Sequence, residues 1–368
     1  MKKVGTLLLT VILFSIVLMG CSQKTNSNGT EDIVVGFIYN GSINDGGNTT
    51  AHDNGRVYLE EQLGEQVKTI YKEDVPEDKS EVLTAIREMV DQGAVIIFTT
   101  SYGYMEGTIE ASKEFPNIKF AHCSGYETTD NMTNYYGRMY QARYLSGIVA
   151  GMKTETNKIA YVATFPNAEV IRGINAFTLG AKSVNPEVEV QVRWTNILDD
   201  PSAEKAAVVE MLDEGCDVTA QHQDSIAIMI AVGESDATSI GYNVSAAELV
   251  PNAYITAPMW NWDNYYLNTV EQVIDGTWTN IPYWGSLSEG IVYLDKLTSL
   301  APEGAEEKVI EIKEKILLEE FQVFSGEIKD QDGNIRAKEG DVLLDEDLIT
   351  MDWFVKGVVG TIPQTNNK

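Results

Sequence analysis

Two successive series of alternating strand-like and helix-like segments constrain the fold more than any other feature of this chain. In the first series, strands are predicted at residues 33–39, 67–71, 94–98, 118–123 and 135–139. In the second series they are predicted at residues 158–163, 188–194, 218–221 and 239–242. Helical segments separate them, at residues 80–90, 104–115, 144–151, 170–182, 203–212 and 225–232 and through Val57, Leu59 and Leu63; the segment at residues 144–151 is rich in small residues and suited to close packing. Such alternation is typical of parallel sheets covered by helices, so the sequence predicts an α/β protein with two doubly wound lobes.

The first predicted strand is followed by a loop rich in Gly and Asn, residues 40–48. A Gly-rich loop between a strand and a helix suggests a phosphate cradle, but this loop fits neither the dinucleotide fingerprint nor the P-loop. We therefore interpret it as a polar loop that faces a ligand. Asp45 would accept hydrogen bonds from donors on that ligand.

An aromatic cluster follows the second series, at residues 257–266. Pro258 is expected to end a strand, and a helix is expected to begin just after it with Asn261 or Asp263 as its N-cap. Trp260 and Trp262 would then lie at a strand-to-helix junction, where ligands bind in open α/β sheets. Their flat rings could stack on a planar ligand, or they could plug an interface between domains.

Few residues are arranged for catalysis or metal binding. The sequence has no His-x-x-x-His or Cys-x-x-Cys spacing and no Gly-x-Ser-x-Gly motif. His122 and Cys123 are adjacent in a predicted strand, so they would point to opposite faces. Residues 222–224 are expected in a loop at a strand end, either contacting a ligand or capping the next helix through Asp224.

The N-terminus reads as a lipoprotein signal peptide, residues 1–20, because a basic start and an apolar run precede Leu18-Met19-Gly20-Cys21. Cys21 would be lipidated and would hold the chain on the extracytoplasmic face of the cell membrane, with residues 21–31 as a tether. An uncleaved membrane anchor is the alternative.

The net charge of −28 argues against nucleic acid and anionic lipid surfaces as partners. Cys123 and Cys216 could pair, but their apolar contexts favour two buried thiols. Residues 322–337 are expected to form a hairpin; the turn at residues 330–334 lacks the spacing of a calcium loop.

Several motifs carry a resemblance to a known family. The chain resembles the basic membrane protein family of substrate-binding lipoproteins, which includes purine nucleoside receptors of ABC importers. The resemblance covers essentially all of the exported chain. It rests on the lipobox, which is the Leu18-Met19-Gly20-Cys21 motif described above, and on residues 36–47, 97–105, 165–166, 170–177, 221–225, 260–262 and 351–354.

The resemblance implies a type I periplasmic-binding fold whose two lobes are joined by a multi-strand hinge. Lobe one would comprise residues 32–156 plus 258–285, and lobe two residues 157–257 plus 286–368. It also implies no catalysis and no cofactor, a ligand enclosed between the lobes, and ABC permease subunits as partners; we expect a monomer. The expected ligand-binding residues are Tyr39, Asp45, Gly46, Asn48, Ser101, Tyr102, Tyr126, Arg172, His222, Asp224, Asn243, Trp260 and Trp262.

Three positions depart from the pattern of the nucleoside receptors. Asn48 stands where those receptors have an aromatic residue that stacks on the base. Asn243 stands at the position of an Asp that binds ribose, and Trp260 stands near a ribose-binding Lys. The expected ligand is thus a purine, and the departures favour a base over a nucleoside.

Other functions stay open from the sequence. The protein could be a ligand sensor without a transport role, or a receptor for another flat heterocycle. A hydrolase or transferase that acts on nucleosides would need an activated water or nucleophile, for which the sequence offers no matching set of residues.

Overall fold

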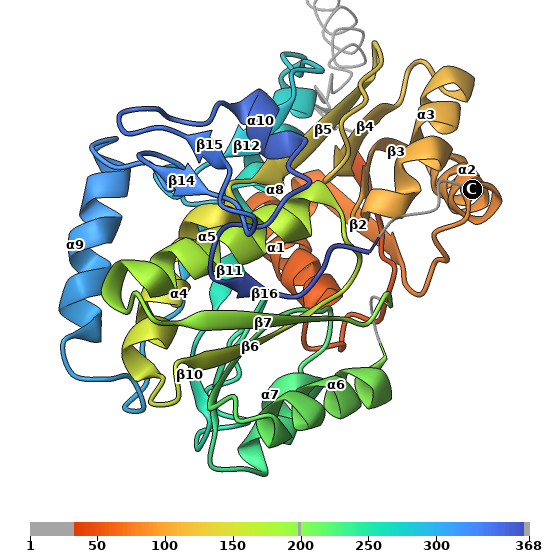
Figure 1. The fold of residues 1–368 in the computed structure, drawn as a ribbon. Helices are drawn as coiled ribbons and strands as arrows, with labels where there is room; N and C mark the ends of the chain where they lie inside the picture. Colours follow the sequence, from red (N-terminus) through yellow and green to blue (C-terminus); the bar gives the residue numbers. More distant parts are fainter. Residues whose placement is uncertain (1–32, 198–199, 364–368) are drawn as a thin grey trace, which may run out of the picture.

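The computed structural model describes residues 33–197 and 200–363, so Cys21, the predicted signal peptide and the tether lie outside the described residues. Two parallel sheets dominate the structure (Figure 1). The first has the order β12–β5–β4–β3–β1–β2. Its strands are β1 Ile33–Ile38, β2 Val67–Lys72, β3 Ala94–Thr99, β4 Lys119–Cys123, β5 Met132–Gly137 and β12 Tyr283–Gly285.

Successive side chains along each strand of the first sheet point to opposite faces, and both sets are buried. Helices therefore cover both faces of this sheet. Phe37 belongs to the core under α1 (Asn48–Leu63) and α8 (Asp263–Ile274). Its neighbour Ile38 belongs to the core under α2 and α3. These two helices, at the right of Figure 1, span Lys79–Asp91 and Met105–Glu114.

The second sheet repeats this arrangement, in the order β10–β9–β8–β6–β7–β16. Its strands are β6 Lys158–Ala163, β7 Glu189–Trp194, β8 Val218–His222, β9 Thr238–Ile240, β10 Tyr254–Thr256 and β16 Val358–Val359. One face is covered by α6 and α7, and the other by α4 and α5. These helices span Pro201–Asp213, Ala227–Gly233, Met139–Lys153 and Ala168–Val184.

The chain passes between the two sheets at residues 137–139, 256–263 and 285–292. At the second and third of these passages, β11 (Pro258–Trp260) pairs antiparallel with β13 (Val292–Leu294). The predicted lobe boundaries stay a prediction. Helix α4 lies in the range expected for lobe one, but it packs along α5, which lies in the range expected for lobe two. The remaining elements are 3₁₀ turns at Gly64–Gln66 and Tyr102–Tyr104, α9 Ala305–Leu317, α10 Asp345–Ile349, β14 Ile328–Lys329 and β15 Ile335–Ala337.

Several local expectations are confirmed or corrected. β10 ends just before Ala257 as expected, but Pro258 opens the short strand β11, a position that proline tolerates. The cap position of α8 falls on Trp262, not on Asn261 or Asp263; the Asn261 Oδ1 atom accepts a 3.3 Å hydrogen bond from the Asp263 amide. β14 and β15 form the predicted hairpin.

Two further observations concern thiols and membranes. Cys123 and Cys216 are free and buried, as the sequence predicts. Within residues 33–197 and 200–363, no helix combines the length and the apolar character that crossing a bilayer requires.

Candidate ligand-binding site

A cavity of about 380 Å³ separates the carboxyl ends of β3 and β4 from the first turns of α5. We call it the cleft cavity. Lobe one contributes Tyr102 and Tyr126, and α5 contributes Glu169 and Arg172. Ligands of open α/β sheets bind at the carboxyl ends of strands, which is where this cavity lies. Its other lining residues are Ser124, Gly125, Asn134, Tyr136, Asn167, Ala168, Pro282, Tyr283, Trp284 and Ile349.

Arg172 ties the cleft cavity to the C-terminal part of the chain. Its Nη1 atom donates a 2.6 Å hydrogen bond to the Leu348 carbonyl in α10. Its guanidinium lies 5.1 Å from the centre of the Trp284 ring. Burial lowers the pKa of Arg172, and the Glu169 carboxylate partly opposes that shift. The guanidinium is therefore held in place by the Leu348 carbonyl and the Trp284 ring.

A smaller cavity of about 120 Å³ lies between the first loop of lobe one and the loop after β8. We call it the acidic pocket because Asp45, Glu77 and Asp224 all line it, beside Asn40, Gly41, Val75 and Pro76. Burial raises the pKa of Asp224 well above its usual value, and the nearby charges of Asp45 and Glu77 raise it further. The pocket thus favours a ligand that presents N–H or O–H donors to these oxygens.

Asp45 also has a structural role that the sequence did not predict. Its Oδ1 atom accepts hydrogen bonds from the Gly47 and Thr50 amides at 2.7 and 3.0 Å and from the Thr50 hydroxyl at 2.8 Å. Its Oδ2 atom accepts from the Thr49 amide at 2.8 Å. These bonds satisfy free amides at the start of α1, so Asp45 fixes the loop whether or not it contacts a ligand.

A third cavity, of about 580 Å³, lies where the start of α1 meets the loop after β9 and strand β11. We call it the tryptophan cavity. Trp260 and Trp262 stack with ring centres 4.6 Å apart. The other face of Trp262 stacks on His52, also at 4.6 Å, so neither face of Trp262 is free for a ligand. The lining residues are Gly46, Thr50, Ala51, Asn54, Ile226, Asn243, Val244, Ser245, Leu249, Met259, Trp260, Asn261, Trp262, Asp263 and Tyr293.

Two buried side chains of the tryptophan cavity keep polar atoms without a partner in the described part of the chain. They are Asn243, through both its Nδ2 and Oδ1 atoms, and Trp262, through its Nε1 atom. Asn243 is 1% exposed and has a φ of 68°, a left-handed conformation that asparagine tolerates. Buried polar groups are normally hydrogen-bonded, so these atoms mark a place where a ligand's polar edge would be stabilised.

A closed series of contacts joins the tryptophan cavity to the cleft cavity. The Trp260 indole N–H donates to the Tyr242 hydroxyl at 3.4 Å, and the Tyr242 ring lies 4.8 Å from the His222 ring. The His222 Nε2 atom is 3.4 Å from Glu169 Oε1, which also accepts a hydrogen bond from the Tyr136 hydroxyl. The Tyr136 ring returns to Trp260 at 4.7 Å. Lobe one, lobe two and the connecting strand β11 all contribute to this series.

The charges within this series are set by burial. Burial lowers the pKa of His222, and the Arg143 and Arg172 guanidinium groups lower it further, against the effect of Glu169. His222 is therefore neutral near pH 7. Burial raises the pKa of Glu169, but His222, the Tyr136 hydroxyl and Arg172 together bring it below its usual value. Glu169 is thus an ionised acceptor at the edge of the cleft cavity.

The structure distributes the predicted ligand-binding residues over the three cavities at the boundary between the lobes and places some of them outside these cavities. Tyr102, Tyr126 and Arg172 line the cleft cavity, Asp45 and Asp224 the acidic pocket, and Gly46, Asn243, Trp260 and Trp262 the tryptophan cavity. The remaining predicted residues, which line none of the three, are Tyr39, Asn48, Ser101 and His222.

These four residues have other positions. Tyr39 is buried in the core of lobe one, where its hydroxyl donates to Asp53 at 3.2 Å. Asn48 is the first residue of α1. The Ser101 hydroxyl donates to Glu77 of the acidic pocket, so Ser101 reaches that pocket only through Glu77. His222 likewise reaches the cleft cavity through Glu169.

Sequence reasoning missed Tyr136, Glu169, Glu77 and Trp284. Glu169 had a usable signal, because it follows Phe165-Pro166 in the first turn after a predicted strand, where ligands bind. Tyr136 was placed in a strand, but the choice of its face required the true start of β5 at Met132. Glu77 and Trp284 lie on segments with no periodic pattern, and only the tertiary structure brings them to the cleft.

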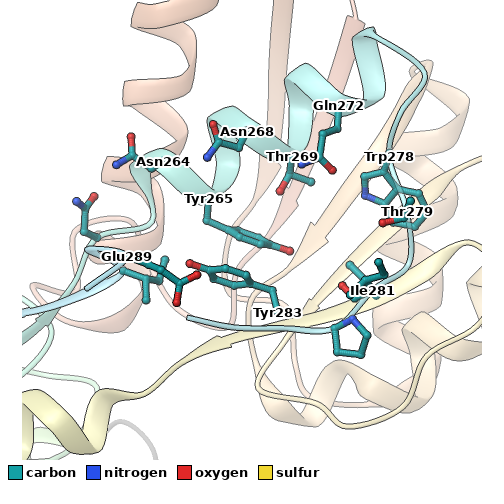
Figure 2. A pocket seen from close by; sticks show the side chains of 14 residues that line it. Asn264, Tyr265, Asn268, Thr269, Gln272, Trp278, Thr279, Ile281, Tyr283 and Glu289 are labelled. Carbon is teal, nitrogen blue, oxygen red and sulfur yellow. The ribbon is translucent and has the colours of Figure 1, made fainter. Parts of the chain in front are cut away.

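A further cavity, of about 450 Å³, lies on the outer side of α8 and contains none of the predicted residues. Figure 2 shows the facing rings of Tyr265 and Tyr283 on its floor, with Asn264, Asn268 and Gln272 along the helix. The two rings stack at 5.0 Å. This cavity is formed by α8, the segment after it and adjoining parts of lobe one, so closure of the lobes would not enclose a ligand there.

Two α/β lobes, linked by several chain passages and lined with polar groups at their boundary, define a solute-binding protein of the periplasmic-binding type. A solved solute-binding protein of an ABC transporter system from Aeropyrum pernix K1 has the same fold. It aligns with a TM-score of 0.69 at 19% identity, covering 81% of this chain and 93% of that one.

The chain belongs to the Bmp family, the PnrA-like ABC transporter substrate-binding proteins, whose model matches residues 33–327. Substrate-binding proteins of this family bind a solute without converting it. Among its relatives is a Brucella abortus purine-binding protein, 36% identical over 92% of this chain and 96% of the relative. A Haloferax volcanii protein, TsgA13, named as a candidate ABC transporter glucose-binding protein, is also 36% identical, over 94% of this chain and 85% of the relative.

Proposed function

We propose that this substrate-binding protein takes a purine base as its solute and encloses it between the two lobes. The observation that carries this proposal is the amide of Asn243, which is buried and keeps both polar atoms unpartnered among the described residues. An asparagine amide offers one donor and one acceptor side by side, the pattern that matches the N6 and N7 edge of adenine.

Two features beside Asn243 support a flat ligand that carries N–H donors. Trp260 lines the same cavity and offers it apolar ring surface beside its own contacts with Trp262 and Tyr136, and an aromatic contact with a base contributes about 1–3 kcal/mol. The acidic pocket offers carboxylate oxygens of Asp45, Glu77 and Asp224 to ring and exocyclic N–H groups. The Brucella purine-binding relative supports the same class of ligand.

The preference for a base over a nucleoside follows from the polar groups at the boundary. The family's nucleoside receptors use an Asp and a Lys near the positions of Asn243 and Trp260, so this chain offers the sugar a neutral amide and a flat ring. Ribose hydroxyls would gain fewer charged partners, and hydrogen bonds to charged groups contribute about 1.5–3 kcal/mol.

The test is a calorimetric titration of the protein after unfolding and refolding to remove any solute retained from the cells. Adenine, guanine, hypoxanthine, adenosine and glucose are titrated separately, and native mass spectrometry of the untreated protein identifies any retained solute. Micromolar or tighter binding of one purine base supports the proposal. Glucose binding with no response to any purine would contradict it and would align the protein with the Haloferax relative.

We propose further that Cys21 carries the lipid anchor, with transport by ABC permease subunits as the role. The support is the lipobox motif together with the family assignment. Cys21→Ser should move the protein from the membrane fraction to the soluble fraction of cells. Unchanged membrane retention in that variant would contradict the anchor. Loss of purine uptake in a deletion strain would support transport, and normal uptake would favour a sensor.

A further inference from the structure

A group of buried polar atoms lies behind the closed series of contacts, between α4 and the second sheet. Arg143 on α4 is 0% exposed and is found in none of the ion pairs of the described residues. Its Nη1 atom donates a 2.6 Å hydrogen bond to the Gln221 carbonyl, and its guanidinium lies 3.9 Å from the centre of the Tyr242 ring. Its Nε and Nη2 atoms have no hydrogen-bond partner in the described structure.

Two more unpartnered atoms approach the same point. They are the Tyr161 hydroxyl and the His222 Nδ1 atom, both buried. A methyl group placed on Gly173 would lie 3.8 Å from Arg143 Nε, 3.8 Å from Tyr161 OH and 3.9 Å from His222 Nδ1. Gly173 thus leaves a space of about one methyl group that is faced by three polar atoms from three different elements.

The donors and acceptors of these atoms define what can fill the space. Arg143 Nε–H is a donor only, and the Tyr161 hydroxyl is a donor or an acceptor. His222 directs Nε2 toward the Glu169 carboxylate, so its proton lies on Nε2 and its Nδ1 atom is an acceptor. An occupant must therefore accept from Arg143 and donate to His222, which a halide ion cannot do.

We infer that Gly173, Arg143, Tyr161 and His222 form a binding site for one buried water molecule that positions the His222 imidazole. Buried waters typically make about three hydrogen bonds to otherwise unsatisfied groups, which is the number available here. The water fixes the tautomer that donates from Nε2, and through Glu169 it fixes an acceptor of the cleft cavity. Arg143 is thus a positioning residue, and the inference does not depend on which solute the cleft takes.

The test compares Gly173→Ala with Gly173→Ser. Ala fills the space with a methyl group that has ordinary van der Waals room, so the variant should fold. It displaces the water and leaves the three polar atoms unpartnered. Ser places a hydroxyl in the same space, which can donate to His222 Nδ1 in place of the water.

Two readouts report on the site itself. A high-resolution crystal structure should show a water within hydrogen-bonding distance of all three atoms in the wild type and not in Gly173→Ala. The ¹⁵N NMR spectrum of His222 should show an unprotonated, hydrogen-bonded Nδ1 in the wild type, a changed Nδ1 shift in Gly173→Ala, and a shift restored toward wild type in Gly173→Ser. A halide ion in the density, an empty site, or a His222 spectrum unaffected by Gly173→Ala would overturn the inference.

A titration with adenine adds a functional readout. Gly173→Ala should weaken adenine binding by three- to tenfold, and Gly173→Ser should recover most of it. If the wild type binds none of the purine bases, the proposed function fails, while the crystal and NMR readouts still decide the water site.

Discussion

Two carboxylates of the acidic pocket illustrate how similar residues at one boundary have different roles. The Asp45 carboxylate accepts hydrogen bonds from the first turn of α1. Asp224 is instead buried beside other acidic groups, and its burial and then their charges raise its pKa. Asp45 therefore stabilises the folded loop. Asp224 destabilises the arrangement in which the two lobes are in contact, unless a ligand supplies hydrogen-bond donors to its carboxylate.

Asp45→Ala should lower the free energy of unfolding by about 0.5–2 kcal/mol, the usual loss for a helix cap. Asp78→Ala is the matched control, because Asp78 caps α2 through the Ser80 and Glu81 amides and lines none of the three boundary cavities. Chemical denaturation without ligand measures both losses. If Asp45 also contacts the ligand, only Asp45→Ala should weaken adenine binding, and equal affinity in the two variants would reduce Asp45 to a cap.

Asp224→Asn should make the protein more stable at neutral pH. Because the pKa of Asp224 is raised on folding, the folded state binds a proton more tightly than the unfolded state, whose pKa is about 3.9. Stability is therefore lost as pH rises from about 4 through the raised pKa, by about 1.4 kcal/mol for each unit of the shift. The variant should differ little from wild type below pH 4 and melt at a higher temperature at pH 7.

Thermal melts from pH 4 to 8 measure this difference, with the exposed Asp236→Asn as the control. A wild-type melting profile in Asp224→Asn across this whole range would contradict the assignment of a strained carboxylate.

At the scale of single residues, the sequence predicted positions better than roles. Tyr102, Asp224, Asn243 and Trp260 were predicted at the boundary, because loops at strand ends meet there. The role of Trp262 could not be predicted, since one of its ring faces is covered by His52, which is far away in the sequence, and the other by Trp260.

Among the elements, α4 and α5 pack closely together, and their backbones meet at glycines. A methyl group on Gly180 would lie 2.0 Å from the Tyr144 carbonyl oxygen, and one on Gly147 would lie 2.1 Å from that of Phe177. The small-residue segment at residues 144–151 predicted such close packing. These helices carry Arg143, Glu169 and Arg172, so their spacing sets the geometry of the cleft.

Gly180→Ala should therefore destabilise the protein by about 1–3 kcal/mol, the usual loss from overpacking. Urea denaturation compares the variant with the wild type, and equal stability would show that the two helices can separate without cost.

Long periodic segments were predicted well, but short elements were not. The strands and helices of both series appear at the predicted places within a few residues. β12, β16 and α10 were missed, because two to five residues carry too little periodicity to be recognised. β12 pairs with β5 and β16 with β7, so the missed strands complete the edges of both sheets.

At the scale of the whole molecule, the structure shows the lobes in contact across the boundary. A methyl group on Gly47 would lie 1.7 Å from the carbonyl oxygen of Asp224 in the other lobe. Gly47 therefore permits a direct backbone approach between the first loop of lobe one and the loop after β8. Ligand-driven closure of a hinged pair of lobes would depend on this approach.

Gly47→Ala should hold the lobes apart, because its methyl group would prevent this backbone approach. Ligand binding should weaken by at least tenfold, since a ligand that cannot close the lobes loses the extra free energy with which it binds the closed form. Small-angle X-ray scattering should show a smaller radius of gyration on adding adenine to the wild type and a reduced change in the variant. Full closure and wild-type affinity in Gly47→Ala would contradict this role.

The most direct test of the central claim is a paired titration of adenine and adenosine against the wild type, Trp260→Ala and Trp262→Ala. The account predicts tighter binding of adenine than of adenosine by the wild type. It predicts a loss of about 1–3 kcal/mol in Trp260→Ala from the aromatic contact between its ring and the base, and a loss in Trp262→Ala from its indole N–H. Tighter adenosine binding, or unaltered affinity in both variants, would contradict the account and leave the two rings as a plug between the lobes.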